Sequence, residues 1–282
     1  SVHGAGVNPG VANLESALRP DVETLPETLL GAGYLTGAVV SNVYLKRGFG
    51  VQRGFQRYDD AMAMGHYPLL FQPMNVILGP KWAGVPYRQA KTLAARAQSF
   101  LGHTAGYRTF LMLHFMDPHA PYFPSDSDLN AMTGSYDDPD ERGYDAEIRG
   151  VDRAIQSVVE ALPKDAIVVI TSDHGERFGE HTDAYEDWHP PLSRHGMSQY
   201  QELLHVPLMI RAPAVEAGRV ERRVSTVDLA ANVAHLVGVE WGGGGDVWPE
   251  LRGERSRLGD AAVSEALLYG RERKAVVLGD WK

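Results

Sequence analysis

The sequence predicts an α/β fold: a three-layer sandwich whose mostly parallel central sheet is flanked by helices, plus the start of a small C-terminal sheet subdomain. Short, uninterrupted apolar segments alternate with amphipathic helical segments, a pattern typical of parallel strands covered on both faces. Hydrophobic residues make up 44% of the 282 residues, enough for a sizeable core. We expect the main domain over residues 1–254 and the beginning of the small subdomain over residues 255–282.

The first helix and strand are predicted near the N-terminal end. Thr24 and Glu27 have the spacing of a capping box, and Gly31 and Gly33 close the short helix that follows. The segment 36–41, TGAVVS, is short, partly β-branched and bounded by Gly and Asn, as a buried strand would be.

The alternation continues along the rest of the chain. The patterns predict helices over residues 86–102 and 144–162, the second ending at Pro163, and buried strands over residues 108–115, 166–171 and 206–211.

Composition excludes several function classes. The formal charge of −9 comes with no cluster of Lys and Arg, so a nucleic-acid partner held through phosphates is disfavoured. The absence of Cys excludes disulfides and thiolate metal sites. No apolar stretch approaches the roughly 20 residues that span a bilayer. The opening SVHGAGVNPG resembles neither a natural start nor a signal peptide, so we expect the natural N-terminus to lie upstream, and the compartment and oligomeric state stay open.

Polar, His-containing clusters follow two of the predicted strands. DPHAPY, residues 117–122, follows the strand at 108–115, and SDHGE, residues 172–176, follows the strand at 166–171. Ligands of such sheets bind beyond the carboxyl ends of the strands. The two clusters are therefore expected to share one site.

Asp173 and His174 offer a carboxylate and an imidazole beside Gly175, which permits close backbone approach. This pair suits a divalent metal ion. The alternative is that Asp173 caps the next helix while His174 only packs.

Asp117 and His119 are spaced to lie on one side of an extended segment that Pro118 and Pro121 stiffen. They have the chemistry to hydrogen-bond an oxyanion, protonate a leaving group or bind a metal ion. Taken alone, DPHAPY also suits an ordinary Pro-rich turn.

The segment from Glu180 to Gly196 lacks apolar periodicity and suits an active-site loop. Most of its residues also suit a solvated loop with no role, but His195, followed by Gly196, is the strongest candidate for chemistry. Residues expected to bind substrate are Asp117, Tyr122, His181, Trp188 and Arg194, with Tyr144 and the segment 66–82 helping to shape the pocket.

In this order and spacing, DPHAPY, TSDHGERFGEH and HGMSQYQELLHVPLMIRAP resemble the sulfatase family of the alkaline phosphatase superfamily. SVHG, TLPETLLGAGYLTGAVVSN and GVQRGFQRYDDA are weaker matches. TVDLAANVAHLVGV resembles a helix of the family, with Ala231 or Asn232 in place of the usual Pro. The resemblance covers nearly the whole chain.

The resemblance implies a hydrolase of sulfate esters that acts on a small-molecule or carbohydrate ester. It implies one divalent ion, commonly Ca²⁺, with Mg²⁺, Mn²⁺ and Zn²⁺ as alternatives, and a formylglycine nucleophile made from Cys or Ser. Asp173 and His174 match metal ligands of the family. His119 matches the histidine that contacts the ester, and His195 lies where the family places a Lys or His near the leaving oxygen.

The chain also departs from the family. The early pair of metal-binding aspartates and the C/S-x-P-S-R nucleophile segment do not occur in it, so this chain holds no nucleophile. Residues 276–282 look like the opening strand of the family's small C-terminal sheet. We therefore expect a fragment that has no useful turnover by itself.

Two other functions remain open. One is a phosphate mono- or diesterase, or a phosphotransferase, with a Ser or Thr nucleophile and two metal ions, the second held by Asp117, His119 and His195. The other is a degenerate, non-catalytic binding domain, which the missing nucleophile favours and the retained DHG and DPH clusters oppose.

Overall fold

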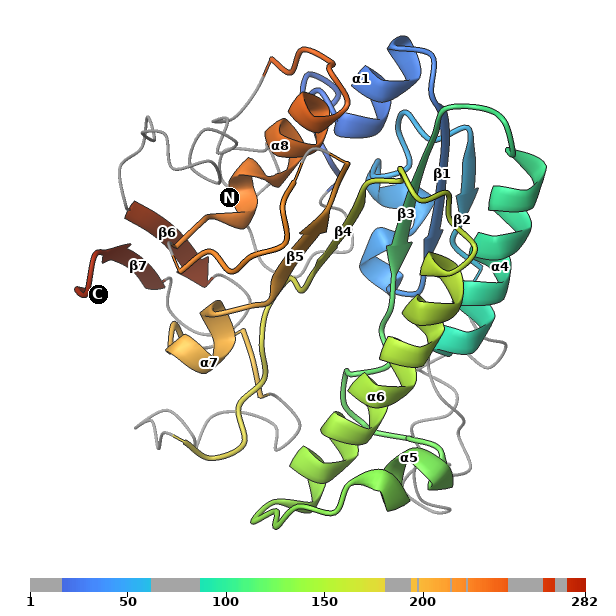
Figure 1. The fold of residues 1–282 in the computed structure, drawn as a ribbon. Helices are drawn as coiled ribbons and strands as arrows, with labels where there is room; N and C mark the ends of the chain where they lie inside the picture. The colour runs from blue at the N-terminus through green and yellow to red at the C-terminus, as the bar shows by residue number, and fades with distance from the viewer. Residues whose placement is uncertain are drawn as a thin grey trace. The chain divides into compact units, whose positions relative to one another are not determined.

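The computed structural model describes residues 17–61, 87–180, 194–196, 198–213, 215–221, 223–242, 261–266 and 273–282. It divides into two compact units (Figure 1). One unit is Tyr34–Leu162, called the 34–162 unit below. The other joins Ser1–Gly33 to Pro163–Lys282 and is called the 163–282 unit.

A three-stranded parallel sheet forms the centre of the 34–162 unit, in the order β2-β1-β3. Its strands are β1 (Leu35–Val40), β2 (Arg57–Asp59) and β3 (Thr109–His114). This confirms the strands predicted over 36–41 and 108–115 to within about a residue at each end, and it confirms the parallel sheet. The three-residue strand β2 has no sequence signal of its own, because it is too short to show a period.

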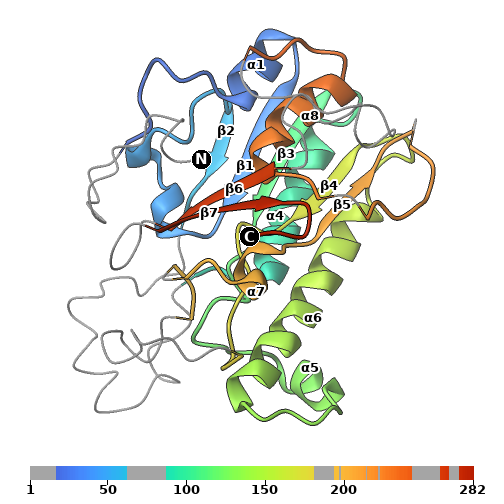
Figure 2. The same cartoon turned by 90° about the vertical axis from the view of Figure 1, so that its left-hand side faces the viewer.

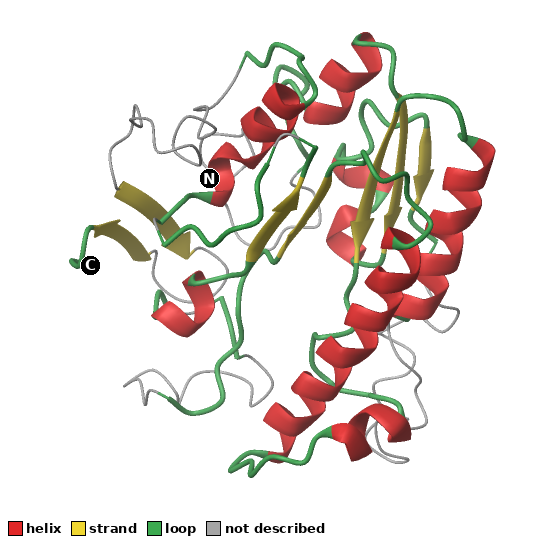
Figure 3. Cartoon of the chain, viewed as in Figure 1, coloured by secondary structure: helices red, strands yellow, loops and turns green. Residues whose placement is uncertain are grey.

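Helices α4 (Ala90–His103) and α6 (Pro139–Val159) pack on one face of this sheet (Figure 3). Their contact is built from small side chains, Ala90, Ala94 and Ala97 of α4 with Ala154 and Val158 of α6, against which Leu111 and Leu113 of β3 pack. Alanine lets two helices and a sheet approach closely without loss of packing density.

The opposite face of the sheet has its own apolar cluster. Ala38 and Val40 of β1 and Tyr58 of β2 pack with Leu45, Val51, Phe55 and Met112. The connection that supplies these side chains contains two single-turn 3₁₀ helices, η1 (Val43–Leu45) and η2 (Arg47–Phe49). The alternation of side chains along β1 and β3 between the two faces is that of a sheet covered on both sides.

Helix α6 begins five residues earlier than the predicted start at Tyr144. Asp138 caps it by accepting a hydrogen bond from the Asp140 backbone at 2.8 Å, and Pro139 occupies the first turn. The first turn is acidic and therefore carries no apolar period. The short helix α5 (Asp126–Ala131) lies beside the N-terminal part of α6 in both ribbon views (Figures 1 and 2), and its buried Asp128 pairs with Arg149 and Arg153.

The 163–282 unit contains short helices and two-stranded sheets. Its elements are α1 (Leu25–Gly31), β4 (Val168–Thr171), α7 (Gln201–Leu204), β5 (Leu208–Arg211), η4 (Thr226–Asp228), α8 (Leu229–Leu236), β6 (Ala261–Ala266) and β7 (Arg273–Leu278). The capping box is confirmed, since the Thr24 backbone donates to Glu27 Oε2 at 2.9 Å and the Glu27 backbone donates to Thr24 Oγ1 at 3.4 Å.

Strands β4 and β5 pair antiparallel, from Val168 opposite Arg211 to Thr171 opposite Leu208. Burial alternates along β5 and Met209 is exposed, so β5 does not have the fully buried character that its apolar run predicts. Strands β6 and β7 also pair antiparallel, and β7 begins three residues before the predicted strand at 276–282. The predicted boundary at residues 254 and 255 lies outside the described residues.

None of the helices in the described part of the chain is both long enough and apolar enough to cross a bilayer.

Replacing Gly37 with Ala is expected to lower the free energy of unfolding by about 1–3 kcal/mol. A Cβ at this position of β1 would lie 2.7 Å from Cε2 of Phe100 in α4, so the Phe100 ring, or the helix that carries it, must shift. Thermal and denaturant unfolding of the chain would measure the change.

Two further variants test this explanation. Gly102→Ala, in α4 with no atom within 4 Å of the new Cβ, should be neutral or stabilising by up to about 1 kcal/mol. Adding Phe100→Leu to Gly37→Ala should cost less than the sum of the two single changes. Strict additivity would mean that the ring is not what excludes the methyl group.

Candidate active site

The loop that leaves β4, residues 172–176, is held against helix α7. The Gly175 backbone N–H donates to the Leu203 carbonyl at 2.9 Å. A Cβ at Gly175 would overlap the carbonyl oxygen of Glu202 and lie 3.0 Å from its carbonyl carbon, so only glycine permits this approach. No helix begins within 173–180, which excludes the alternative that Asp173 caps a following helix.

Asp173 and His174 present their side chains outward from this loop, with exposed fractions of 72% and 40%. His174 Nδ1 lies 2.7 Å from the Gly175 carbonyl, an acceptor, so this nitrogen carries a proton and the lone pair of the neutral ring lies on Nε2. His174 Nε2 is 3.8 Å from Asp173 Oδ1. Two ligand atoms that bind the same metal ion at about 2.0–2.5 Å lie about 3–4 Å from each other. The separation of Asp173 Oδ1 and His174 Nε2 therefore suits two ligands of one divalent ion.

The pair is only part of a coordination sphere. Across the described residues, no group of three or more His, Asp or Glu side chains is arranged to hold a metal ion. A backbone carbonyl that orients a histidine through its other ring nitrogen is the usual outer contact of a metal ligand. The Gly175 carbonyl has this relation to His174.

His195 lies directly against His174, although 20 residues separate them in the chain. The two rings stack with their centroids 4.1 Å apart and their planes at 27°. His195 Nδ1 is 3.0 Å from Glu176 Oε1, and the Glu176 side chain is only 4% exposed. The structure therefore brings together three of the residues that the sequence singled out, Asp173, His174 and His195, and adds a buried carboxylate.

Arg194 packs on residues 177 and 178, which directly follow the 172–176 loop. Its guanidinium carbon is 4.8 Å from the centroid of the Phe178 ring, and its Nη1 donates to the Arg177 carbonyl at 3.4 Å. His181 and Trp188 lie outside the described residues. The substrate contacts expected of these three side chains stay predictions.

In the 34–162 unit, the segment from Asp117 to His119 is not extended but forms a turn, the alternative that the sequence left open for DPHAPY. The His119 backbone donates to the Met116 carbonyl at 3.0 Å and closes the turn. Asp117 Oδ1 accepts from the Ala90 backbone at 2.7 Å, so the carboxylate is directed at the start of α4. His119 Nδ1 lies 2.6 Å from the Ala120 carbonyl and donates to it.

Tyr87 and Glu147 form hydrogen bonds at this turn and in the segment that follows it, and neither residue was identified from the sequence. The Tyr87 hydroxyl is 3.0 Å from the Asp117 carbonyl and 3.4 Å from both the His119 carbonyl and Glu147 Oε1. Glu147 Oε1 also accepts from the Phe123 backbone at 2.7 Å. A signal existed for Glu147, since it shares the helical phase of the apolar residues at 151, 154 and 158 and a carboxylate on a buried face needs partners.

Burial raises the pKa of Glu147 to about 8, and the nearby Asp117 carboxyl adds to the rise. Burial also raises the pKa of Asp117, against the hydrogen bond from Ala90. The pKa of the Tyr87 hydroxyl is raised by burial and by Glu147. The cluster therefore favours neutral side chains.

Tyr122 lies against helix α6. Its ring meets the Tyr144 ring edge-on, with the centroids 5.9 Å apart, and a Cβ at Gly143 would be 3.0 Å from Tyr122 Cβ. The role of Tyr122 in substrate binding stays a prediction.

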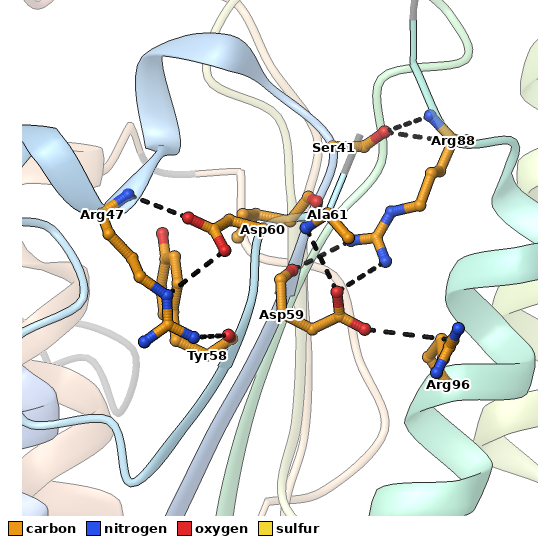
Figure 4. Close-up of polar contacts among 9 residues, drawn as sticks. Ser41, Arg47, Tyr58, Asp59, Asp60, Ala61, Arg88 and Arg96 are labelled. Atoms are coloured by element: carbon orange, nitrogen blue, oxygen red, sulfur yellow. Dashed lines mark hydrogen bonds and ion pairs between the residues drawn. The ribbon is translucent and has the colours of Figure 1, made fainter. Parts of the chain in front are cut away.

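The carboxyl ends of β1 and β2 carry a charged network, which Figure 4 shows. The buried Arg88 guanidinium donates to Asp59 Oδ1 at 2.8 Å and to the Val40 carbonyl at 2.6 Å, while its backbone donates to Ser41 Oγ at 2.7 Å. Beside it, the Arg47 backbone donates to Asp60 Oδ2 at 3.0 Å. Because these groups bind one another, the network fixes the strand ends.

Comparison with protein families gives one clear match. A family model described as Sulfatase matches residues 2–239. Among curated proteins, the chain is 30% identical over 126 residues to a phosphopentomutase of Deinococcus radiodurans, covering 44% of this chain and 28% of the relative. It is 38% identical over 79 residues to arylsulfatase K of Danio rerio, covering 28% of this chain and 13% of the relative. The matches thus span well under half the length of these relatives.

Solved structures confirm the predicted fold class. The crystal structure of Ps i-CgsB in complex with k-i-k-neocarrahexaose matches with a TM-score of 0.70 at 22% identity, covering 98% of this chain and 68% of that one. The phosphonate monoester hydrolase of Silicibacter pomeroyi matches with a TM-score of 0.61 at 22% identity, covering 92% and 66%.

The chain is expected to lose stability as the pH rises from about 5 to about 8. The pKa of Glu147 is about 8 in the folded chain against an ordinary value of 4.5, so the folded state keeps a proton that the unfolded chain releases. Stability then falls by on the order of 1 kcal/mol per pH unit across that window and levels off above it. Unfolding by denaturant at a series of pH values measures the slope.

Glu147→Gln, which keeps the shape and removes the titration, should flatten this dependence and raise stability at pH 8. Glu160→Gln, at an exposed glutamate just after α6, serves as the matched control and should leave the slope unchanged. An unchanged slope in Glu147→Gln would contradict the assignment.

Proposed function

Because the chain belongs to the sulfatase family, we propose that the protein hydrolyses a sulfate monoester of a small molecule or carbohydrate, using a divalent ion at Asp173 and His174. The observation that carries the proposal is the Asp173 and His174 donor pair, 3.8 Å apart, with the His195 ring stacked beside it. An exposed carboxylate and imidazole at the end of a strand, next to a second histidine, suit an ester whose charged oxygens need neutralising.

A bound ion would supply positive charge against the nonbridging oxygens of the sulfate group. Asp173 would contribute a carboxylate oxygen and His174 its Nε2, with the Gly175 carbonyl keeping the ring in place through Nδ1. We propose Ca²⁺ as the ion, with Mg²⁺, Mn²⁺ and Zn²⁺ as the competing candidates for the same pair.

His195 and His119 would act at the other end of the scissile bond. On the resemblance of their motifs to those of the family, we propose that His119 contacts the ester and that His195 lies near the leaving oxygen, where an imidazole N–H stabilises developing negative charge. The nucleophile of the proposal is a formylglycine from residues other than these 282. A carbohydrate substrate gains support from the oligosaccharide complex of Ps i-CgsB, whose fold this chain shares.

A phosphate ester is the second candidate, which the identity to a phosphopentomutase favours. In this version, Asp117, His119 and His195 would hold a second ion. The surroundings of Asp117 argue against it, because one carboxyl oxygen already accepts from the Ala90 backbone at 2.7 Å and burial disfavours the charged carboxylate, which raises its pKa.

Metal content and substrate preference decide between the two candidates. The protein from the complete parent gene should bind one divalent ion per chain and hydrolyse aryl sulfates in preference to aryl phosphates. Two ions per chain, about 4 Å apart, with preference for phosphate esters would establish the second candidate instead. Elemental analysis and parallel assays with both esters give the answer.

Replacing His119 with Ala in the complete protein is expected to lower kcat by about 10²-fold or more while the metal affinity changes little. The reason is that His119 is proposed to contact the ester and is not one of the two proposed metal ligands, Asp173 and His174. Replacing His174 with Ala should instead weaken metal binding. Steady-state kinetics and metal titration on both variants separate the roles, and unchanged kcat in the His119 variant would remove it from the mechanism.

A further inference from the structure

Glu176 has no role in the proposal so far, although its side chain contacts His195, a proposed catalytic residue. Its Oε1 lies 3.0 Å from Nδ1 of His195, and the two residues come from opposite ends of the segment 176–195. The Glu176 side chain is 4% exposed and that of His195 is 16% exposed. A carboxylate this buried is costly unless polar groups satisfy it, so the contact is a strong restraint on both side chains.

The ring of His195 is restrained on a second side by His174. The stacking at 4.1 Å and 27° limits tilting of the His195 ring, and the Nδ1 contact limits its rotation about the Cβ–Cγ bond. With both restraints, the Nε2 edge of the ring faces away from Glu176. The orientation of His195 is thus set by a carboxylate on one edge and an imidazole on one face.

We propose that Glu176 is a positioning residue that accepts from Nδ1–H of His195 and so holds the ring with Nε2 directed at the leaving oxygen of the ester, to which the doubly protonated ring donates its Nε2–H. The inference rests on the proposed function, because it needs His195 to act on the ester. The arrangement follows the general rule that a reacting histidine is oriented by a hydrogen bond at its other nitrogen.

A purely structural role for Glu176 makes a different prediction. If the contact only ties the segment 194–196 to the loop after β4, its loss lowers stability and reduces turnover of all esters by the same factor. If Glu176 positions His195, removing the Glu176 carboxylate lowers kcat most for esters with poor leaving groups, because their leaving oxygen gains the most negative charge. The dependence of kcat on the leaving group therefore separates the two roles.

The experiment compares Glu176→Ala and Glu176→Gln in the metal-loaded complete protein, with phenyl sulfate as the poor leaving group and 4-nitrophenyl sulfate as the good one. Glu176→Ala should lower kcat on phenyl sulfate by about 10–100-fold and on 4-nitrophenyl sulfate by much less, with little change in KM. Glu176→Gln should recover much of the loss, because its amide oxygen can accept from Nδ1. Equal losses on both esters, or no recovery in Glu176→Gln, would overturn the proposal.

Glu180→Gln is the matched control. Glu180 is an exposed glutamate on the same loop whose Oε2 accepts from the Phe178 backbone at 2.7 Å. Its replacement should leave the ratio of the two kcat values unchanged. A changed ratio would mean that any alteration of the loop disturbs the leaving-group step.

A measurement that needs no turnover keeps this inference distinct from the proposed function. In the 282-residue chain with ¹⁵N-labelled histidine, NMR should find a proton on Nδ1 of His195 and a clear shift of that Nδ1 signal in Glu176→Ala. An unmoved signal overturns the contact itself. If the signal moves but the complete protein hydrolyses no sulfate or phosphate ester, the proposed function fails and the catalytic purpose of Glu176 fails with it.

Discussion

The carboxyl edge of the parallel sheet β2-β1-β3 imposes the constraint on which the 34–162 unit depends. Parallel strands all end at one edge, so the polar groups of three departing segments have to be satisfied within a small, partly buried region. Arg88 binds the Val40 carbonyl at the end of β1 and Asp59 at the end of β2, and Asp117 after β3 caps the helix that Arg88 precedes. Helix α4 is consequently attached to all three strand ends by side chains and backbone together.

In the loop after β4, the backbone polar groups also need hydrogen-bond partners, and for Gly175 another backbone segment supplies the partner. The Gly175 N–H donates to the Leu203 carbonyl. The two segments can come this close only because Gly175 has no Cβ. Both histidines of the site then have an acceptor at Nδ1, a backbone carbonyl for His174 and a buried carboxylate for His195. A neutral carbonyl dipole thus orients His174, the proposed metal ligand, and a carboxylate orients His195, which is proposed to act at the leaving oxygen.

The parts of the fold that could be predicted are those whose stabilising contacts or burial pattern involve residues close together in the sequence. The strands at 36–41 and 108–115 are apolar without interruption because both faces are buried, and the capping box at Thr24 is a contact between residues three apart. Strand β2 could not be predicted because three residues show no period. The turn at Asp117 is closed locally by the His119 backbone and the Met116 carbonyl, and the motif suits such a turn, whereas the contact of the Asp117 side chain with Ala90 spans 27 positions and has no local signal. The order of the polar motifs identified the family correctly. Tyr87 and Glu147 could not be paired from sequence, since they are 60 positions apart and only the packing of α4 and α6 on one sheet face brings them together.

The alanines of α4 have a consequence for how this sequence can drift over evolutionary time. Ala90, Ala94 and Ala97 are buried against α6, where even one added methylene would have to displace a neighbour. Substitutions along this contact are therefore expected to arise in compensating pairs, a larger side chain in one helix offset by a smaller one in the other. Thr92, Ala95 and Ser99, exposed on the other side of the same helix, can change independently. A single helix thus has one face that evolves as a coupled group and one that evolves residue by residue.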